Sequence, residues 1–182
     1  MKLSKPRIPP LGEEDWDEQT ADYMRRFEQP VFNIFRTLSN HPDLMRRWLV
    51  FGNHILGKST FPARERELVI LRIGYLCKAE YEWGQHVLIA REVGLSDEEI
   101  RGIKEGPGAD IWNETDALLL KATDELRQDA QIGDETWRGL EQYYSPQQLM
   151  DLVFTVGQYN LVSMALNSFG VQPDPGLPTF DI

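Results

Sequence analysis

Hydrophobic residues recur at helical spacing along most of the chain, and prolines, glycines and capping residues separate the repeats. Residues 42–56 illustrate the pattern, because Leu44, Trp48, Phe51 and Ile55 lie three or four positions apart and define one face of a helix. The same reasoning predicts helices over residues 15–28, 42–56, 62–77, 79–93, 96–104, 115–131, 134–144 and 145–170, and a short turn of helix over 33–38.

The segment 62–77 has the least typical pattern. It begins with polar residues and then becomes apolar on nearly every side in the run LVILRIGYL, so a helix here would be buried on most faces. The run is also rich in β-branched residues, and its periodicity does not exclude a buried strand. The acid-rich start and the lack of a partner strand favour a helix.

Capping signals and prolines define the expected boundaries. Ser96 and Ser145 each begin a capping box, in SDEE and SPQQ. The proline-rich ends, residues 1–12 and 172–182, predict extended arms. We therefore expect an all-α fold, with one domain spanning residues 1–182 that forms a bundle of six to eight helices with extended N- and C-terminal arms.

Composition narrows the class of protein. The chain has 182 residues, of which 41% are hydrophobic and 26% charged, as in ordinary globular domains. Its net charge of −10 argues against nucleic acid and anionic membrane surfaces as partners. No apolar run reaches the ~20 uncharged residues of a membrane span, and the N-terminus lacks the apolar region of a signal peptide. A cytoplasmic protein is expected.

The inventory of reactive groups is small. One cysteine, Cys77, excludes an internal disulfide and a dithiol redox cycle within one chain. The sequence has no nucleotide-binding glycine motif, no HExxH and no serine nucleophile elbow. One histidine with one carboxylate on a helix provides too few ligands for a metal site. We therefore expect neither a cofactor nor a metal ion.

Histidine is scarce, and one of the three histidines has a suggestive neighbour. Glu82 precedes His86 by four residues, so the two share a helix face. Such a pair can fix the imidazole in one tautomer and raise its basicity. The alternative is an exposed salt bridge worth ~0.3–0.5 kcal/mol, which spacing by itself favours. His54 is a weaker candidate for substrate contact, with a structural hydrogen bond as its alternative, and His41 fits a surface turn.

Arg72 interrupts the apolar run LVILRIGYL and is expected to be buried. A buried guanidinium is costly unless it is paired. Its partner could be Glu67, Glu82 or a carboxylate from another helix or subunit. Alternatively, its planar fork could bind a substrate carboxylate. Arg72 is therefore a candidate substrate-binding residue.

Residues 64–94, RERELVILRIGYLCKAEYEWGQHVLIAREVG, resemble the carboxymuconolactone decarboxylase family, which includes the alkylhydroperoxidase AhpD-like proteins. The resemblance extends more weakly over residues 30–172. It implies an all-α fold and a homo-oligomer, such as a trimer or hexamer. Two helices that are apolar on nearly every side, together with the proline-rich arms, also predict an oligomer. They present more apolar surface than a monomer of this size can bury.

The peroxidase branch of that family has a glutamate, then a C-x-x-C pair after eleven intervening residues, then a histidine four residues beyond the second cysteine. Glu67 and His86 match the glutamate and the histidine, whereas Ala79 and Glu82 stand at the cysteine positions. Tyr81 replaces a relay histidine. The chain's cysteine lies two residues too early to substitute, so the thiolate and resolving partner that peroxide reduction needs are missing.

Without the cysteine pair, the residues matched to the family form an acid/base set. We expect Glu67, Tyr81, Glu82 and His86 to be the catalytic residues. Their two helices should pack antiparallel, with the axial levels of Glu67 and His86 only ~6 Å apart. Trp83, in the same YEWGQH motif, is a further candidate for substrate contact, although tryptophan in such a helix more often belongs to the core.

The resemblance implies a cofactor-free lyase, like the decarboxylases, or an isomerase that acts on a small organic acid or lactone. In that reaction an arginine would hold the carboxylate, while His86 would transfer a proton and a glutamate would orient the imidazole. Two alternatives stay open. One is a non-catalytic member that binds a ligand or serves as an oligomeric scaffold, and the other is a peroxidase, which the missing cysteine pair disfavours.

Overall fold

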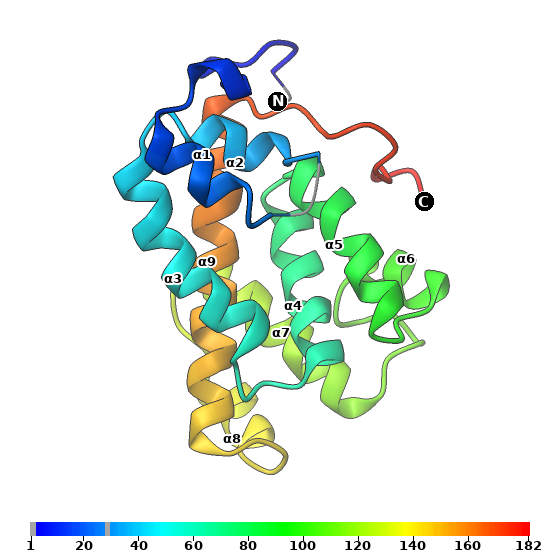
Figure 1. Ribbon diagram of the computed structural model, residues 1–182. Helices are drawn as coiled ribbons and strands as arrows, with labels where there is room; N and C mark the ends of the chain where they lie inside the picture. The colour runs from blue at the N-terminus through cyan, green and yellow to red at the C-terminus, as the bar shows by residue number, and fades with distance from the viewer. Residues whose placement is uncertain (1–2, 28–29) are drawn as a thin grey trace.

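The computed structural model describes residues 3–27 and 30–182, and within them the chain is all-helical (Figure 1). The all-α fold is confirmed. These residues form nine α-helices, more than the expected six to eight, because short segments form separate helices. The predicted end of the first helix at residue 28 lies outside the described residues. The elements are η1 (Glu13–Asp15), α1 (Glu18–Met24), α2 (Asn33–Leu38), α3 (Pro42–Gly57), α4 (Ala63–Leu76), α5 (Glu80–Glu92), α6 (Asp97–Glu105), α7 (Glu114–Asp129), α8 (Asp134–Leu140) and α9 (Pro146–Phe169).

Helix α4 is the centre of the bundle, and α5, α6, α7 and α9 all pack against it. Every residue from Glu67 to Gly74 is buried. This environment explains the apolar pattern on all sides, because each face of the helix meets another helix. The segment that could also have been a buried strand is thus a buried helix.

A tight turn joins α4 to α5 and makes the two helices antiparallel. Lys78 adopts a left-handed backbone conformation with φ of 54°. The Ala79 N–H donates to the carbonyl of Gly74 at 2.9 Å, which closes the end of α4. This reversal brings the middle of α5 beside the first half of α4.

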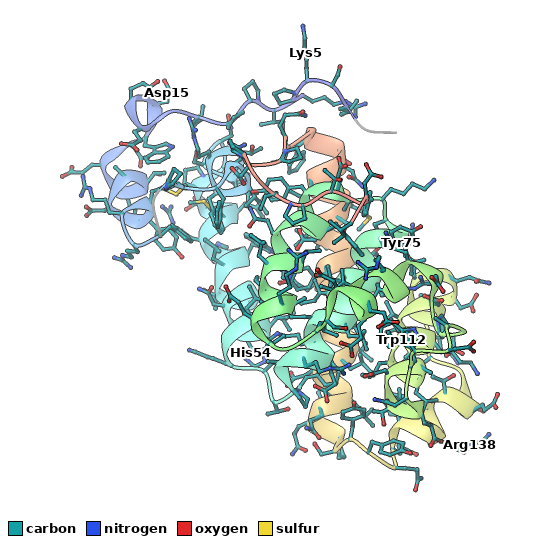
Figure 2. All side chains as sticks on the ribbon, turned by 90° about the vertical axis from the view of Figure 1, so that its right-hand side faces the viewer. Lys5, Asp15, His54, Tyr75, Trp112 and Arg138 are labelled. Carbon is teal, nitrogen blue, oxygen red and sulfur yellow. The ribbon has the colours of Figure 1, made fainter. Side chains whose placement is uncertain are left out.

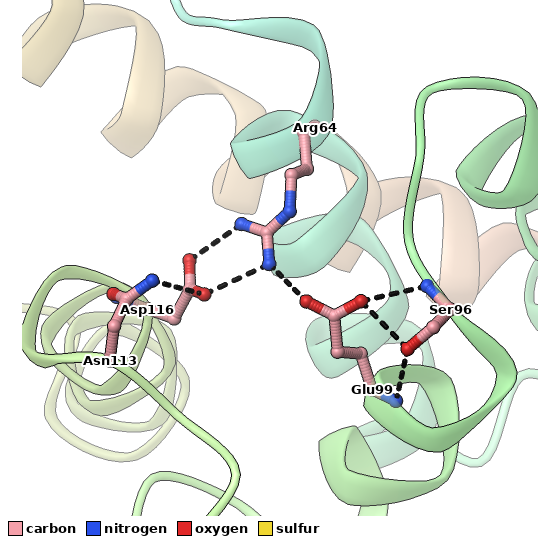
Figure 3. A network of polar contacts seen from close by, with 5 residues as sticks. All are labelled: Arg64, Ser96, Glu99, Asn113 and Asp116. Carbon is pink, nitrogen blue, oxygen red and sulfur yellow. Dashed lines mark hydrogen bonds and ion pairs between the residues drawn. The ribbon is translucent and has the colours of Figure 1, made fainter.

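Polar contacts fix the N-terminal end of α4 against α6 and α7 (Figure 3). Arg64 donates to both oxygens of Asp116, at 2.8 and 2.9 Å, and also to Glu99. Glu99 in turn belongs to the capping box that Ser96 opens. Because the guanidinium bridges two other helices, the start of α4 is held in register with the rest of the bundle.

The two arms lie on the body of their own chain. In the N-terminal arm, the N–H groups of Arg7 and Ile8 donate to the carbonyl of Phe169 at the end of α9. The C-terminal arm crosses from α9 toward α5 and α6 (Figure 1). It passes so close to Gly84 that a Cβ there would lie 2.7 Å from the carbonyl oxygen of Pro178, so this position requires glycine.

Helix α9 is long and apolar enough to cross a membrane by length and composition. Half of its most apolar window is buried, and it packs against α3, α4, α5 and α7. Buried residues of α9, such as Leu149, Leu152 and Val156, belong to the main hydrophobic core. The buried side of α9 therefore belongs to the core of the bundle.

Candidate functional site

The imidazole of His86 lies between two carboxylates. Its Nδ1 is 2.6 Å from Glu67 Oε2, and its Nε2 is 3.0 Å from Glu82 Oε1. Glu67 comes from α4, whereas the other two side chains come from successive turns of α5. All three residues are buried. The predicted convergence of these groups is confirmed, and we call Glu67, His86 and Glu82 the carboxylate–imidazole relay.

The two neighbouring carboxyl groups control the protonation of His86. Burial lowers the pKa of His86, but the charge and hydrogen bond of Glu67, followed by those of Glu82, outweigh burial and raise the pKa to about 10. At neutral pH the imidazole is therefore a cation that donates one N–H to each carboxylate. Arg66 Nε lies 3.3 Å from the second oxygen of Glu67 and adds a further cation at the buried end.

The raised pKa of His86 predicts a pH-dependent stability. The protonated imidazole stabilises the folded state fully below its unfolded pKa of about 6.5. This contribution should be lost as the pH rises toward the folded pKa of about 10. We expect the free energy of unfolding, measured in urea, to fall by a few kcal/mol across this range. His86→Gln should flatten the dependence, and an equally steep fall in the variant would contradict the assignment.

A cavity of about 190 Å³ lies beside the relay. Helices α2, α3, α5 and α9 contribute to its wall. Glu82 and His86 line it, whereas Glu67 lies behind them. Among the described residues, no lysine or arginine lines the cavity. Its wall is rich in aromatic side chains: Phe27, Phe32, Phe35, Trp48, Tyr81 and Tyr159.

The size of the cavity limits what it can hold. A dry cavity of roughly 150 Å³ suffices for benzene, and drug-sized ligands occupy roughly 300–1,000 Å³. The space beside Glu82, at about 190 Å³, therefore suits a single ring with small substituents. A larger, more open depression of about 660 Å³ lies between the two arms and the α4–α5 turn, but no relay residue lines it.

Tyr81, a predicted catalytic residue, lines the cavity, but its hydroxyl already has two hydrogen-bond partners. The hydroxyl donates to Asp174 at 2.6 Å and accepts from the Ile34 N–H at 3.2 Å. Burial, and then the hydrogen bond to Asp174, raise the pKa of Tyr81 well above its usual value. Tyr81 therefore stays protonated and connects the C-terminal arm to the start of α2.

The structure corrects the expectation for Arg72. Its guanidinium forms a bidentate pair with Asp124 of α7, at 2.6 and 2.7 Å, and donates to the carbonyl of Ile103 at 2.7 Å. Arg72 does not line the cavity. The alternative interpretation, a carboxylate partner from another helix, is the one observed. Gly106 makes this possible, because a Cβ there would lie 2.7 Å from the guanidinium.

Two other predicted substrate contacts also lie away from the cavity. Trp83 is fully buried and does not line the cavity. Its Nε1–H donates to the carbonyl of Thr179 at 3.0 Å, and its ring meets Phe180. His54 lies on α3 (Figure 2). Half of its side chain is exposed, and its Nε2 lies 3.5 Å from Asp151 Oδ1. Both residues have structural contacts in place of the predicted substrate contacts.

Sequence reasoning missed the contribution of α9. Tyr159 meets the His86 ring edge-on, with centroids 4.8 Å apart, and lines the cavity together with Gln158. Burial, followed by the charges of Glu82 and Glu67, raises the pKa of Tyr159 well above its usual value. The signal was present, because VGQYN places polar groups inside the most apolar helix of the chain.

Comparison with known proteins agrees with these features. The sequence model of the carboxymuconolactone decarboxylase family matches residues 42–105, the segment that contains the whole relay. This match makes the central third of the chain similar to that family. No curated protein matches the sequence significantly.

Solved structures show that this chain has an AhpD-like fold. An uncharacterised peroxidase-related protein from Silicibacter sp. TM1040 aligns with a TM-score of 0.82 at 14% identity, over 98% of this chain and 99% of that chain. An uncharacterised peroxidase-related protein with an alkylhydroperoxidase AhpD core, from Ralstonia eutropha JMP134, gives a TM-score of 0.81 at 16% identity, over 93% of both chains. A cysteine-to-alanine variant of the debrominase Bmp8, in complex with 2,3,4-tribromopyrrole, gives 0.77 at 18% identity, over 94% of both.

The single cysteine of the chain lies outside the site. Cys77 follows the last residue of α4, its Sγ lies 3.2 Å from Asn160 Oδ1, and it does not line the cavity. We expect Cys77→Ser to leave any peroxide consumption at the wild-type level, because no second thiol exists to resolve a sulfenic acid. A coupled thiol–peroxide assay tests this. Robust turnover that the substitution abolishes would contradict it.

The relay does not have the geometry of a metal site. Among residues 3–27 and 30–182, no group of three or more His, Cys, Asp and Glu side chains is arranged to hold a metal ion. In the relay the imidazole separates the two carboxylates, so the three side chains do not converge on one point. The arrangement is suited instead to proton transfer.

Proposed function

We propose that this protein is a cofactor-free acid/base catalyst, a lyase or isomerase that acts on a small ring-sized organic acid or lactone. One observation carries the proposal: the relay ends on a carboxylate, Glu82, at the wall of an aromatic cavity of about 190 Å³. The match of residues 42–105 to the carboxymuconolactone decarboxylase family model supports a catalytic role.

The geometry favours Glu82 over His86 as the group that exchanges a proton with substrate. Both ring nitrogens of His86 are engaged by carboxylates. Glu82 uses Oε1 for this contact, and its Oε2 has no hydrogen-bond partner within the described residues. His86 would then orient Glu82 and hold its charge, and Glu67 would keep the imidazole protonated.

The proposed reaction needs no oxidant, reductant or cofactor. In an isomerisation, Glu82 would take a proton from a carbon beside a carbonyl group and return it to another carbon of the same delocalised anion. In a decarboxylation, loss of CO₂ would leave the electron pair on carbon. The His86 imidazolium would then pass a proton to that carbon through Glu82, and solvent would replace the proton. The aromatic wall would exclude water from the anion.

A panel of single-ring lactones and unsaturated ring acids tests the proposal. Each compound would be incubated with the protein and followed by proton NMR, which reports both chemical conversion and ligand binding. Conversion of at least one compound supports the proposal. Binding without conversion across the panel would favour the non-catalytic ligand-binding alternative.

We also propose that the protein is a homo-oligomer, a trimer or hexamer. Met150, Phe154, Leu161 and Met164 are each at least half exposed and lie along one face of α9. Phe51 of α3 extends this surface, because its ring contacts that of Phe154. Together these five residues form an apolar face that a second copy of the chain would cover.

Disruption of the apolar face tests the assembly. Wild-type protein should scatter light as a multiple of its 21.0 kDa chain mass. Phe154→Glu should shift it toward the monomer, because a charge would be buried without a partner. Leu88→Glu, at an exposed position on α5, is the matched control. A wild-type mass of one chain would contradict the proposal.

The remaining expectations concern location and partners. The acidic charge of −10 supports a small molecule as ligand in place of nucleic acid or an anionic membrane. The single half-buried cysteine is compatible with a reducing compartment. We propose a cytoplasmic location on this basis.

A further inference from the structure

Three polar groups at the cavity have no hydrogen-bond partner within the described residues. The Nε1–H of Trp48 is buried and unpaired. Gln158 is 6% exposed and Tyr159 5% exposed, and neither the amide nor the hydroxyl makes a hydrogen bond in this part of the chain. Unlike Trp48 Nε1, their polar atoms are not fully enclosed, so a molecule in the cavity can reach them. Buried polar groups are rarely left unpaired, because desolvation without a partner is destabilising. A ligand in the cavity would supply the partner.

These groups and Glu82 enter the cavity from different helices. Trp48 comes from α3, whereas Gln158 and Tyr159 are consecutive residues of α9. Glu82 comes from α5. The cavity thus combines N–H and O–H donors with one carboxylate that accepts. Burial raises the pKa of Tyr159, so its hydroxyl keeps the proton that it would donate.

The charges around the cavity disfavour an anionic ligand. Two acidic side chains, Glu67 and Glu82, flank the one basic side chain of the relay, His86. No lysine or arginine among the described residues lines the wall, and Arg72 is engaged with Asp124. Within the part of the chain that the structure describes, the only cation at the wall is the imidazolium of His86, and Glu67 and Glu82 already engage both of its nitrogens. A substrate carboxylate would therefore be desolvated beside Glu82 with no free cation in this part of the chain to pair with it.

We infer that Gln158 and Tyr159, with Trp48 at the same wall, bind the carbonyl oxygen of a neutral ring compound, such as a cyclic enone or lactone, whose acidic carbon faces Glu82. This inference rests on the proposed proton transfer and narrows its substrate class, because it excludes ring acids. When Glu82 takes the proton, the electron pair of the C–H bond delocalises into an enolate. The negative charge then develops on the oxygen that the donors contact, and it disappears when Glu82 returns the proton.

Three probes of similar shape test the inference through binding: cyclohex-2-enone, cyclohexene and cyclohex-1-ene-1-carboxylate. Saturation-transfer NMR and titration of chemical shifts measure their affinity for wild type and for the variants Gln158→Leu and Tyr159→Phe. Ser163→Ala is the matched control, because Ser163 is also a buried, unpaired polar residue of α9 but does not line the cavity. Melting temperatures verify that each variant is folded.

We expect the enone to bind at least tenfold more tightly than either other probe. Gln158→Leu and Tyr159→Phe should each weaken enone binding about tenfold and leave cyclohexene binding unchanged. Ser163→Ala should bind the enone like wild type. The inference is overturned if the carboxylate binds best, if the enone does not bind at millimolar concentration, or if both variants bind it normally.

Failure of this inference differs from failure of the proposed function. If the enone binds through Gln158 and Tyr159 but no compound is converted, the carbonyl site stands and the proton-transfer proposal fails. If wild type converts ring acids while both variants retain full affinity for the enone, the proton-transfer proposal stands and the carbonyl site fails.

Discussion

Glu82→Gln should lower the rate of any proton transfer in the cavity by roughly 10²- to 10⁴-fold. The amide has nearly the shape of the carboxylate and can still accept the N–H of His86, but it cannot take a proton from carbon. Because the substitution keeps the size of the side chain, the affinity for substrate should change little. The loss should therefore appear in kcat, measured by NMR on any compound that the panel identifies.

The matched control for this variant is Glu92→Gln on the same helix. Glu92 is exposed at the end of α5 and does not line the cavity. It should retain wild-type kcat. If Glu82→Gln is as active as wild type, proton transfer does not pass through this carboxylate.

The second large effect concerns stability. Asp124→Ala should lower the free energy of unfolding by about 3 kcal/mol, because it leaves the buried guanidinium of Arg72 without its anion. We take the lower end of the expected range, since the Asp124 side chain is 31% exposed and water can partly replace it. Urea unfolding monitored by circular dichroism measures the change.

A double variant distinguishes a structural role of Arg72 from substrate binding. Arg72→Met combined with Asp124→Leu removes both charges and should recover much of the lost stability. At a temperature where both forms are folded, ligand affinity should equal that of wild type, since Arg72 lies outside the cavity. Normal stability with lost affinity would restore Arg72 as a substrate anchor.

The relay could be predicted from sequence because its geometry is local. Glu67 and His86 lie on consecutive helices joined by a tight turn, so their levels follow from the rise per residue. Glu82 and His86 lie one helical turn apart. The observed distances of 2.6 and 3.0 Å agree with this reasoning. The role of each group could not be predicted from the sequence, because it depends on the side of the relay at which the cavity lies. The structure places the cavity on the side of Glu82.

The rest of the site depends on contacts between distant segments. Arg72 finds its partner on α7, 52 residues away, and no pattern within α4 distinguishes that ion pair from a substrate contact. Tyr81 likewise donates to Asp174 of the C-terminal arm, 93 residues away. Gln158 and Tyr159 occupy an apolar helix in which polar residues looked like interruptions. Only the packing of α9 beside α3 and α5 shows that these two side chains line the cavity.

Exchange of solvent deuterium into a bound ring compound tests the central claim most directly. The protein would be incubated in D₂O with cyclohex-2-enone and with single-ring lactones, and loss of the proton signal beside the carbonyl would be followed by NMR. We predict that wild type accelerates the exchange over buffer and that Glu82→Gln does not, while Cys77→Ser exchanges at the wild-type rate. Equal exchange rates in wild type and Glu82→Gln would contradict a relay that delivers protons through Glu82.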